Sequence, residues 1–421
     1  MFSSFFSTTD PTAQNFHPVS SEYKPEDLAG ALEPKDLEWT CAGGFITETQ
    51  TWYATLEDGT SLMCQVIHSA VGMWYPQIQL TFKLANPVTG ENTWKSINVT
   101  NFVTPPPGLD KRSSKSDQFT ITHKDIPGGG EYPETYSITV NCGDELKVML
   151  DIRRPTAVPG FKVGKGPKGG FSYFGTDKAN PEGYVVHRFW PLTQTVGNVV
   201  VKGASRAIDA PGIFIHAIQG MRPNLVAARW NFVHFKSPSH PGTSTVQMEF
   251  TTTDSYGKKG SGSGYVSVNV GALVTDGKLA AITAETKWPG DKTEEGAVVS
   301  RCDHLKPVVD PETTYPAPTE LLFTWKGPAL VGSGDVKGVL QVDVGEPSAP
   351  KGLIEKVDVL GEIPGAVKSI VSYVAGTKPY IYQWINPAKL ILTGSDDLAP
   401  GLSSGLEVEG HAYVESSYIS Y

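Results

Sequence analysis

Hydrophobic and polar residues alternate with a period of two along most of this 421-residue chain. The clearest run has a branched aliphatic residue at every second position from Leu146 to Ile152. Such alternation is typical of a β-strand with one buried face. Consecutive short strands without helices between them favour antiparallel sandwiches or barrels. We predict strands at residues 45–56, 62–69, 77–83, 94–103, 121–124, 136–142, 146–153, 184–190, 198–202, 213–218, 230–235, 246–252, 265–270, 279–286, 321–325, 339–344, 353–360, 380–384, 388–393 and 406–415.

The stretch from residue 213 to 235 lies just past the middle of the chain and organises the rest. Residues 213–218 are almost wholly apolar, which predicts a strand buried on both faces. Gly220 and Pro223 break that strand, and a second strand follows at 230–235. We interpret the break as the crossing between two β domains, residues 36–222 and 223–421, preceded by an irregular segment of residues 1–35.

One helix is predicted in the second domain. Apolar residues recur at the helical period between Pro364 and Gly376, with the proline at the first turn and the glycine as the C-terminal cap. A helix beside a sheet can cover its edge or plug the end of a barrel.

Composition narrows the function. A net charge of −9 argues against a nucleic-acid surface. The four cysteines form no C-x-x-C pair and are expected to be free thiols of a reducing compartment. We find no apolar run of 18 residues and no secretory signal, so we expect a cytoplasmic protein.

The N-terminus offers a membrane contact. Phe2, Phe5 and Phe6 share one face of a short helical stretch that ends before Pro11. So short a helix is marginal in water and would form only on a membrane. The alternative is a frayed terminus.

Motifs for chemistry are weak in this chain. Residues 164–169 spell G-x-G-x-x-G, but no strand precedes them and no helix follows, so we predict a loop over 159–170. His68, His187, His216 and His234 each lie in a predicted strand without ligand spacing to a carboxylate, which favours hydrogen-bonded core histidines over a metal or proton-transfer site. His187 and Arg188 are adjacent, so one of them faces inward and can hold a polar head group.

Several segments resemble the fungal survival factor 1 family of oxidative-stress survival proteins. They are HRFWP at 187–191, HAIQGMRP at 216–223, WNF at 230–232, FTT at 250–252, SYG at 255–257 and AGTKPYIYQ at 375–383. The resemblance runs from Asp36 to the C-terminus. It implies two lipocalin-like domains in tandem that bind ceramide and carry it from the endoplasmic reticulum to the Golgi. It also implies an acetylated, amphipathic N-terminal helix and a role in survival under oxidative and cold stress.

We therefore expect an all-β protein of two tandem lipocalin-like antiparallel barrel or sandwich domains with one helix in the second. A barrel pocket would replace the bilayer around hydrocarbon chains, which is worth ~0.8 kcal/mol per buried CH₂. We expect no catalytic residue, metal or cofactor. The expected lipid contacts are His187, Trp190, Phe214, His216, Trp230 and Phe232, and the expected membrane contacts are Met1, Phe2, Phe5 and Phe6.

The expected location is the cytoplasm, at the surface of endoplasmic reticulum and cis-Golgi membranes, with the nucleus as a further location. Two alternatives stay open. The first is an isomerase or cyclase of hydrophobic small molecules that uses His187 or His216 as acid or base; it requires both side chains in one cavity with a carboxylate in reach. The second is an interaction module with a solid core.

Overall fold

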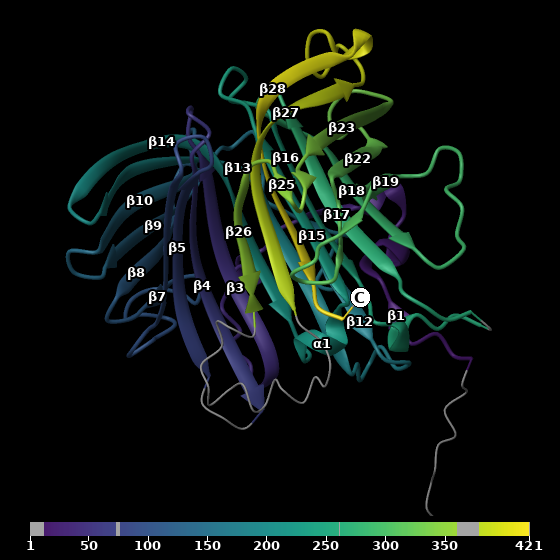
Figure 1. Ribbon diagram of the computed structural model, residues 1–421, viewed down its shortest axis with the longest axis horizontal. Helices are drawn as coiled ribbons and strands as arrows, with labels where there is room; N and C mark the ends of the chain where they lie inside the picture. The colour runs from purple at the N-terminus through teal and green to yellow at the C-terminus, as the bar shows by residue number, and fades with distance from the viewer. Residues whose placement is uncertain (1–11, 73–75, 261, 360–378, 421) are drawn as a thin grey trace, which may run out of the picture.

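Figure 1 shows the computed structural model, which describes residues 12–72, 76–260, 262–359 and 379–420. Two large antiparallel sheets lie side by side, the first formed by the purple-to-teal half of the chain and the second by the green-to-yellow half. The first is a half-barrel and the second a nearly closed barrel. The all-β prediction of two tandem antiparallel barrel or sandwich units is confirmed.

The first sheet has the strand order β6-β5-β4-β3-β14-β13-β10-β9-β8-β7, and β1, β2, β11 and β12 join it beside β13. The bounds of its strands are β1 Phe16–His17, β2 Ala29–Ala31, β3 Gly44–Thr55, β4 Ser61–Gly72, β5 Gln77–Asn86, β6 Glu91–Asn98, β7 Ser114–Lys115, β8 Phe119–Asp125, β9 Glu134–Asn141, β10 Leu146–Arg154, β11 Phe161–Val163, β12 Phe171–Phe174, β13 Gly183–Val201 and β14 Ala204–Gln219.

The second sheet has the order β18-β17-β16-β15-β28-β27-β23-β22-β19, with β26 paired to β27. Its strands are β15 Arg229–Lys236, β16 Ser244–Thr251, β17 Ser267–Thr275, β18 Lys278–Lys287, β19 Val299–Leu305, β22 Glu320–Pro328, β23 Asp335–Asp343, β26 Leu353–Asp358, β27 Tyr380–Thr393 and β28 Leu406–Tyr418. The remaining elements are α1 Pro223–Val226, the ribbons β20 Val308–Val309 with β21 Pro316–Ala317 and β24 Gly345–Glu346 with β25 Ala349–Pro350, and the 3₁₀ turns η1 Val19–Glu22, η2 Pro25–Asp27, η3 Pro34–Asp36, η4 Asp254–Tyr256 and η5 Leu402–Ser404.

Several strands are longer than predicted because proline does not end them. The predicted strands at 184–190 and 198–202 are both parts of β13, which passes through Pro191. A proline cannot donate to the ladder, and the pairing of β13 with β14 shifts register between Trp190 and Thr193. In the same way, β27 runs through Pro387 and joins two predicted strands. The prediction of a strand at 94–103 extends too far, since β6 ends at Asn98.

Two other sequence predictions need correction. The stretch before residue 36, expected to be irregular, contributes β1 and β2, and Phe16 is fully buried against Phe174 at a ring distance of 4.9 Å. A large aromatic residue in this stretch forms core and does not stay on the surface. The predicted loop at 159–170 contains β11, in which Phe161 pairs with Phe189 of β13.

Some predictions fall outside the described residues. These are the membrane contacts Met1, Phe2, Phe5 and Phe6 and the helix between Pro364 and Gly376. Within the described part of the chain, no helix is long and apolar enough to span a membrane. The domain boundaries at residues 36 and 223 stay predictions.

Most of the buried apolar side chains belong to three layers. One lies on the inner, concave face of the first sheet, one between the two sheets, and one inside the second barrel. Both faces of β14 are buried, as predicted, since Ile213 and Ile215 face the second sheet while Phe214 and His216 face the inner side of the first. The strands β13 and β14 are therefore a wall shared by two layers.

Candidate functional site

The six predicted lipid contacts do not converge on one site. In the pairing of β13 with β14, Trp190 lies opposite Phe214 and Arg188 opposite His216, and these four side chains share the inner face of the first sheet. Adjacent strand residues point to opposite faces, so His187 points toward the second sheet. It lies there beside Trp230, at a ring distance of 5.9 Å.

The inner face of the first sheet carries a compact aromatic cluster, which we call the aromatic floor. Its members are each buried to 1% exposure or less and come from β3, β9, β13 and β14: Trp52, Tyr136, Trp190 and Phe214. The rings of Trp52 and Tyr136 lie 5.3 Å apart, and Phe214 lies 4.9–5.3 Å from the other three. Two predicted lipid contacts, Trp190 and Phe214, therefore belong to a larger cluster.

Three polar atoms of the aromatic floor have no hydrogen-bond partner in the described part of the structure. They are Nε1 of Trp52, Nε1 of Trp190 and the hydroxyl of Tyr136. Buried Trp and Tyr groups usually find a partner, because an unpaired buried donor costs about 1–3 kcal/mol. Burial raises the pKa of Tyr136 well above its ordinary value, so the hydroxyl stays protonated. The floor thus presents three donors to any oxygen acceptor that enters.

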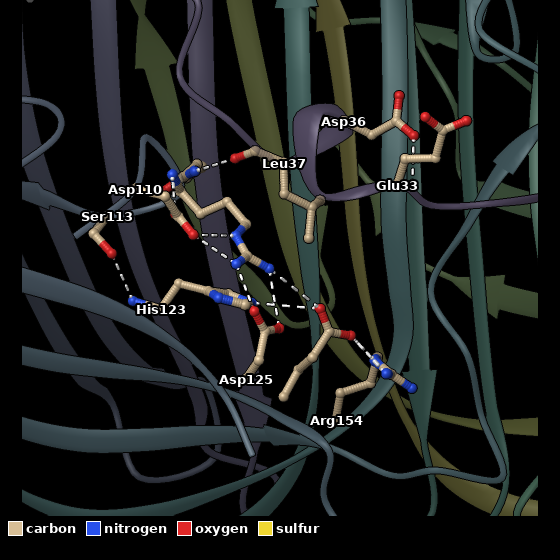
Figure 2. A network of polar contacts seen from close by, with 11 residues as sticks. Glu33, Asp36, Leu37, Asp110, Ser113, His123, Asp125 and Arg154 are labelled. Atoms are coloured by element: carbon tan, nitrogen blue, oxygen red, sulfur yellow. Dashed lines mark hydrogen bonds and ion pairs between the residues drawn. The ribbon is translucent and has the colours of Figure 1, made fainter. Parts of the chain in front are cut away.

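An ion network borders the aromatic floor. Asp110 and Asp125 flank the guanidinium of Arg112, with contacts of 2.6 Å to each, and Arg154 pairs with Glu134 at 2.6 Å. Figure 2 labels Asp110, Asp125 and Arg154 of this network. Hydrogen bonds from Arg112 lower the pKa of Asp110, which keeps that carboxylate charged.

The same network contains a group with the composition of a metal site. Ligand atoms of His123, Asp125 and Glu134 lie within 4.8 Å of one another. The guanidinium of Arg112 already pairs with the Asp125 carboxylate, and Arg154 pairs with Glu134. These charges favour an ion-pair network over a cation site.

Residues 33–41, which we call the strap, cross the inner face beside the floor. Leu37 and Trp39 are 2% and 1% exposed and belong to the apolar layer of this face. The amide side chain of Gln50 donates to the carbonyl of Leu37 at 3.2 Å, and Nδ1 of His216 lies 2.9 Å from the carbonyl oxygen of Asp36. Side chains of β3 and β14 therefore hold the strap by its backbone.

Glu48 of β3 makes the densest set of these contacts. Its carboxylate accepts hydrogen bonds from the N–H of Thr40 (2.9 Å), the hydroxyl of Thr40 (2.7 Å) and the N–H of Cys41 (2.8 Å). It also lies 2.9 Å from Nε2 of His216. Burial alone would raise the pKa of Glu48, but hydrogen bonds from His216 and Thr40 outweigh burial and lower it. Both ring nitrogens of His216 face oxygen atoms, Nδ1 the carbonyl of Asp36 and Nε2 the carboxylate of Glu48.

A second pair of charges meets Asp36 of the strap. Lys162 donates to its carboxylate at 2.7 Å, and Nε of Arg188 lies at 3.5 Å, too far for a hydrogen bond. Arg188 is 6% exposed, and its Nε and Nη1 have no hydrogen-bond partner among the described residues. Burial lowers the pKa of Arg188. This guanidinium is a further donor on the inner face.

His187, Trp230 and Phe232 lie in the layer between the sheets. A small cavity of about 10 Å³ lies there, lined by His187, Val185 and Phe250 among others, with room for a single water. Burial, and to a lesser degree the charge of Arg188, lowers the pKa of His187 to about 3, so the ring is neutral near pH 7. Because His187 and His216 face opposite sides of the sheet, the shared cavity that the enzyme alternative requires is not formed by these two residues.

The outer face of the first sheet has more open space for a ligand than the layer between the two sheets. An open hollow of about 430 Å³ lies on the outer face near the β8–β9 turn, lined by Gly129, Tyr132 and Arg153 among others. A pocket for a drug-sized ligand measures roughly 300–1,000 Å³. Neither this hollow nor the small cavity between the sheets is lined by the aromatic floor. The four side chains of the aromatic floor are each 1% exposed or less, so a lipid on this floor needs side chains there to move.

Sequence reasoning missed several polar residues of the inner face. Glu48 and Gln50 have the same parity as Trp52 in a strand whose inner face is otherwise apolar. Polar residues at core positions of an alternating strand are a signal of a special role. His216 is the hydrogen-bonded core histidine that the sequence favours, but the sequence spacing did not identify Glu48 as its partner.

Comparisons with known proteins agree with the fold. The model of the Svf1 family matches residues 2–420. The ceramide-binding protein svf1 of Aspergillus fumigatus is 34% identical over 356 residues, 84% of this chain and 78% of that protein. The protein of the same name from Emericella nidulans is 30% identical over 406 residues, 96% of this chain and 93% of that one. The crystal structure of CghA with Sch210972 superposes with a TM-score of 0.59 at 11% identity over 97% and 99% of the two chains, a likeness of fold alone.

Proposed function

Since this chain belongs to the Svf1 family, we propose that it binds ceramide on the inner face of its first sheet and transfers it between the endoplasmic reticulum and the Golgi. The observation that carries the proposal is the set of unpaired donors on the aromatic floor. Trp52, Tyr136 and Trp190 present N–H and O–H groups inside an apolar layer. A ceramide offers an amide and hydroxyl oxygens next to hydrocarbon chains, so it matches both properties.

The binding energy comes from two sources. Burial of hydrocarbon gives ~0.8 kcal/mol per CH₂ removed from water. The polar groups contribute less to affinity, about 0.5–1.5 kcal/mol for each hydrogen bond, but they determine orientation. The free energy of burying the hydrocarbon chains is nearly the same in the protein and in a bilayer. The lipid can therefore leave the protein again, as a carrier requires.

Membrane contact is the second part of the proposal. Met1, Phe2, Phe5 and Phe6 would insert into the surface of endoplasmic reticulum and cis-Golgi membranes, with acetylation removing the terminal charge. Such docking is weak and reversible, as a shuttle requires. Ceramide delivery of this kind is the proposed route by which the protein supports survival under oxidative stress.

The test uses Tyr136→Phe and a matched control. Tyr53→Phe removes a hydroxyl from a buried tyrosine of β3 that faces the second sheet. We expect Tyr136→Phe to weaken ceramide binding about tenfold and to leave stability unchanged or slightly higher, because the lost hydroxyl has no partner in the ligand-free protein. Native mass spectrometry after incubation with ceramide vesicles measures the first effect, and urea unfolding the second.

Two results would count against the site. Equal ceramide occupancy in Tyr136→Phe, Tyr53→Phe and the unaltered protein would remove Tyr136 from it. Failure of the unaltered protein to take up ceramide at one molecule per chain would remove the function itself.

One observation favours an enzyme that would use His216 without His187 as a second candidate function. Nε2 of His216 lies 2.9 Å from Glu48, an acid–base pair on a hydrophobic wall. An isomerase or cyclase of a hydrophobic molecule would need this pair free of the strap. Mass analysis of lipids extracted after prolonged incubation separates the two functions, since a carrier returns its lipid unchanged and an enzyme returns a product.

A further inference from the structure

The strap fills the inner face with apolar side chains. The ring of Trp39 lies 5.9 Å from that of Phe102 and 6.1 Å from that of His216, and Leu37 belongs to the same buried layer. Apart from η3, the strap has no regular secondary structure. Its apolar side chains therefore occupy the kind of volume that hydrocarbon chains would occupy on this face.

The polar groups of the strap that bind to the wall are of the same kinds as those of a lipid with an amide group. The wall of the first sheet recognises two amide carbonyls, of Asp36 and Leu37, and two amide N–H groups, of Thr40 and Cys41. It also accepts a hydrogen bond from a hydroxyl, that of Thr40, at 2.7 Å from Glu48. An amide carbonyl, an amide N–H and hydroxyls are the polar groups of a ceramide.

The strap is attached in a way that allows release. Most of the contacts described above come from side chains of the wall. Among the described residues, the backbone hydrogen bond from the strap to another segment runs from the N–H of Trp39 to the carbonyl of Lys111 at 2.9 Å, while those of Asp36 and Leu37 stay within the strap. Cys41 has a φ of 43°, a left-handed conformation that is costly for a residue with a side chain. No ladder has to be broken to lift this segment.

We propose that the strap is an internal substitute for the lipid, and that Glu48, Gln50 and His216 bind the amide and hydroxyl groups of the ceramide once the strap has left. The inference rests on the proposed function and deepens it by assigning the head-group contacts. Binding and strap closure then compete for the same wall. The observed affinity equals the intrinsic affinity multiplied by the fraction of molecules whose strap is open.

Hydrogen exchange of the unaltered full-length protein provides the first test. Ceramide is loaded from vesicles, its one-to-one occupancy is checked by native mass spectrometry, and exchange is followed in peptides covering residues 33–41. We expect ceramide to speed exchange at Thr40 and Cys41 by about tenfold or more, because their N–H groups lose Glu48. Peptides from β22 in the second barrel serve as the internal reference.

Paired variants provide the second test. Leu37→Ala weakens the strap without touching the wall, so we expect a ceramide Kd about tenfold lower. Glu48→Gln weakens the strap and the wall together, so exchange at Thr40 rises while ceramide affinity falls about tenfold. Leu340→Ala, at a fully buried leucine of the second barrel, controls for general loss of stability and is expected to leave the Kd unchanged.

The outcomes separate the two levels of the proposal. Ceramide bound at one per chain with unchanged or slower exchange in the strap overturns the inference and leaves ceramide binding intact. Weaker binding in a folded Leu37→Ala, or tighter binding in Glu48→Gln, overturns it as well. Absence of ceramide binding to the unaltered protein instead overturns the proposed function.

Discussion

The inner face of the first sheet and the interior of the second barrel bury polar groups in different ways. Inside the second barrel, Glu249 accepts from the amides of Asn231 (2.9 Å) and Asn269 (3.2 Å), and Asn231 accepts from His304 and Ser416, both at 2.8 Å. On the aromatic floor of the first sheet, the donors have no such partners. Burial is common to both clusters, but the polar groups of the Glu249 network are paired and the three donors of the aromatic floor are not.

Two tryptophans illustrate the difference between a paired and an unpaired buried N–H group. Trp325 of the second barrel and Trp190 of the first sheet are both fully buried. Nε1 of Trp325 donates to the carbonyl of Val246 at 3.1 Å, whereas Nε1 of Trp190 has no partner among the described residues. The unpaired N–H is a local cost that a ligand acceptor would remove.

The largest expected effect is in the second barrel. Glu249→Ala leaves the amides of Asn231 and Asn269 buried without their acceptor, so we expect a loss of about 3 kcal/mol in the free energy of unfolding. Urea unfolding measures it, with the exposed Glu294→Ala as control. A loss no larger than that of the control would mean that the polar network of this barrel is not a finished core.

The pH dependence of stability tests the burial of His187, which lies on β13 between the two sheets. Burial lowers the pKa of His187 from 6.5 to about 3. Between pH 6.5 and pH 3, His187 therefore binds a proton in the unfolded chain but not in the folded protein. Stability therefore falls as the pH drops below 6.5, by about 2 kcal/mol from this residue between pH 7 and pH 5. His187→Leu should flatten the profile by about that amount, and the exposed His240→Leu should not. If the free energy of unfolding varies with pH in the same way in the unaltered protein and in His187→Leu, the His187 ring is not held neutral by burial.

The paired tryptophans predict a smaller difference. Trp325→Phe and Trp190→Phe remove similar volumes, but only the first breaks a hydrogen bond in the ligand-free protein. We expect Trp325→Phe to be the more destabilising by about 1 kcal/mol, measured by urea unfolding. The order should reverse for ceramide affinity, where Trp190→Phe alone is expected to matter. If Trp325→Phe and Trp190→Phe change stability equally and change ceramide affinity equally, the two regions do not differ in the way proposed.

The smallest effect is expected for cysteine chemistry. Burial raises the pKa of Cys64, on the inner face, to about 12, and raises that of Cys302, inside the second barrel, well above its ordinary value. Alkylation of Cys64 near neutral pH should be about a thousandfold slower than that of an ordinary thiol, and Cys302 should also resist it. Mass spectrometry after iodoacetamide measures it, with the unfolded chain as the positive control. Rapid labelling of Cys64 alone would show that the first sheet opens without lipid.

Much of the fold follows from the alternation of side chains, and the candidate site follows from it only in part. The period of two predicts both sheets and the crossing near Pro223. The six predicted contacts divide between layers because the sequence does not say which side of β13 faces inward. The contact between His216 and Asp36 joins residues 180 positions apart, and no local pattern encodes such a distance. The passage of β13 through Pro191 also depends on a partner strand that shifts register.

The two-sided burial of β13 restricts how this protein can change. Arg188 and His187 stand on opposite sides of one strand, so the insertion of a single residue before them would turn the guanidinium toward the second sheet and the imidazole toward the inner face. Insertion of two residues would restore the parity of every following side chain. Length variation in this strand is therefore expected in even steps, or beside the irregular pairing at Pro191, where an odd residue can be absorbed.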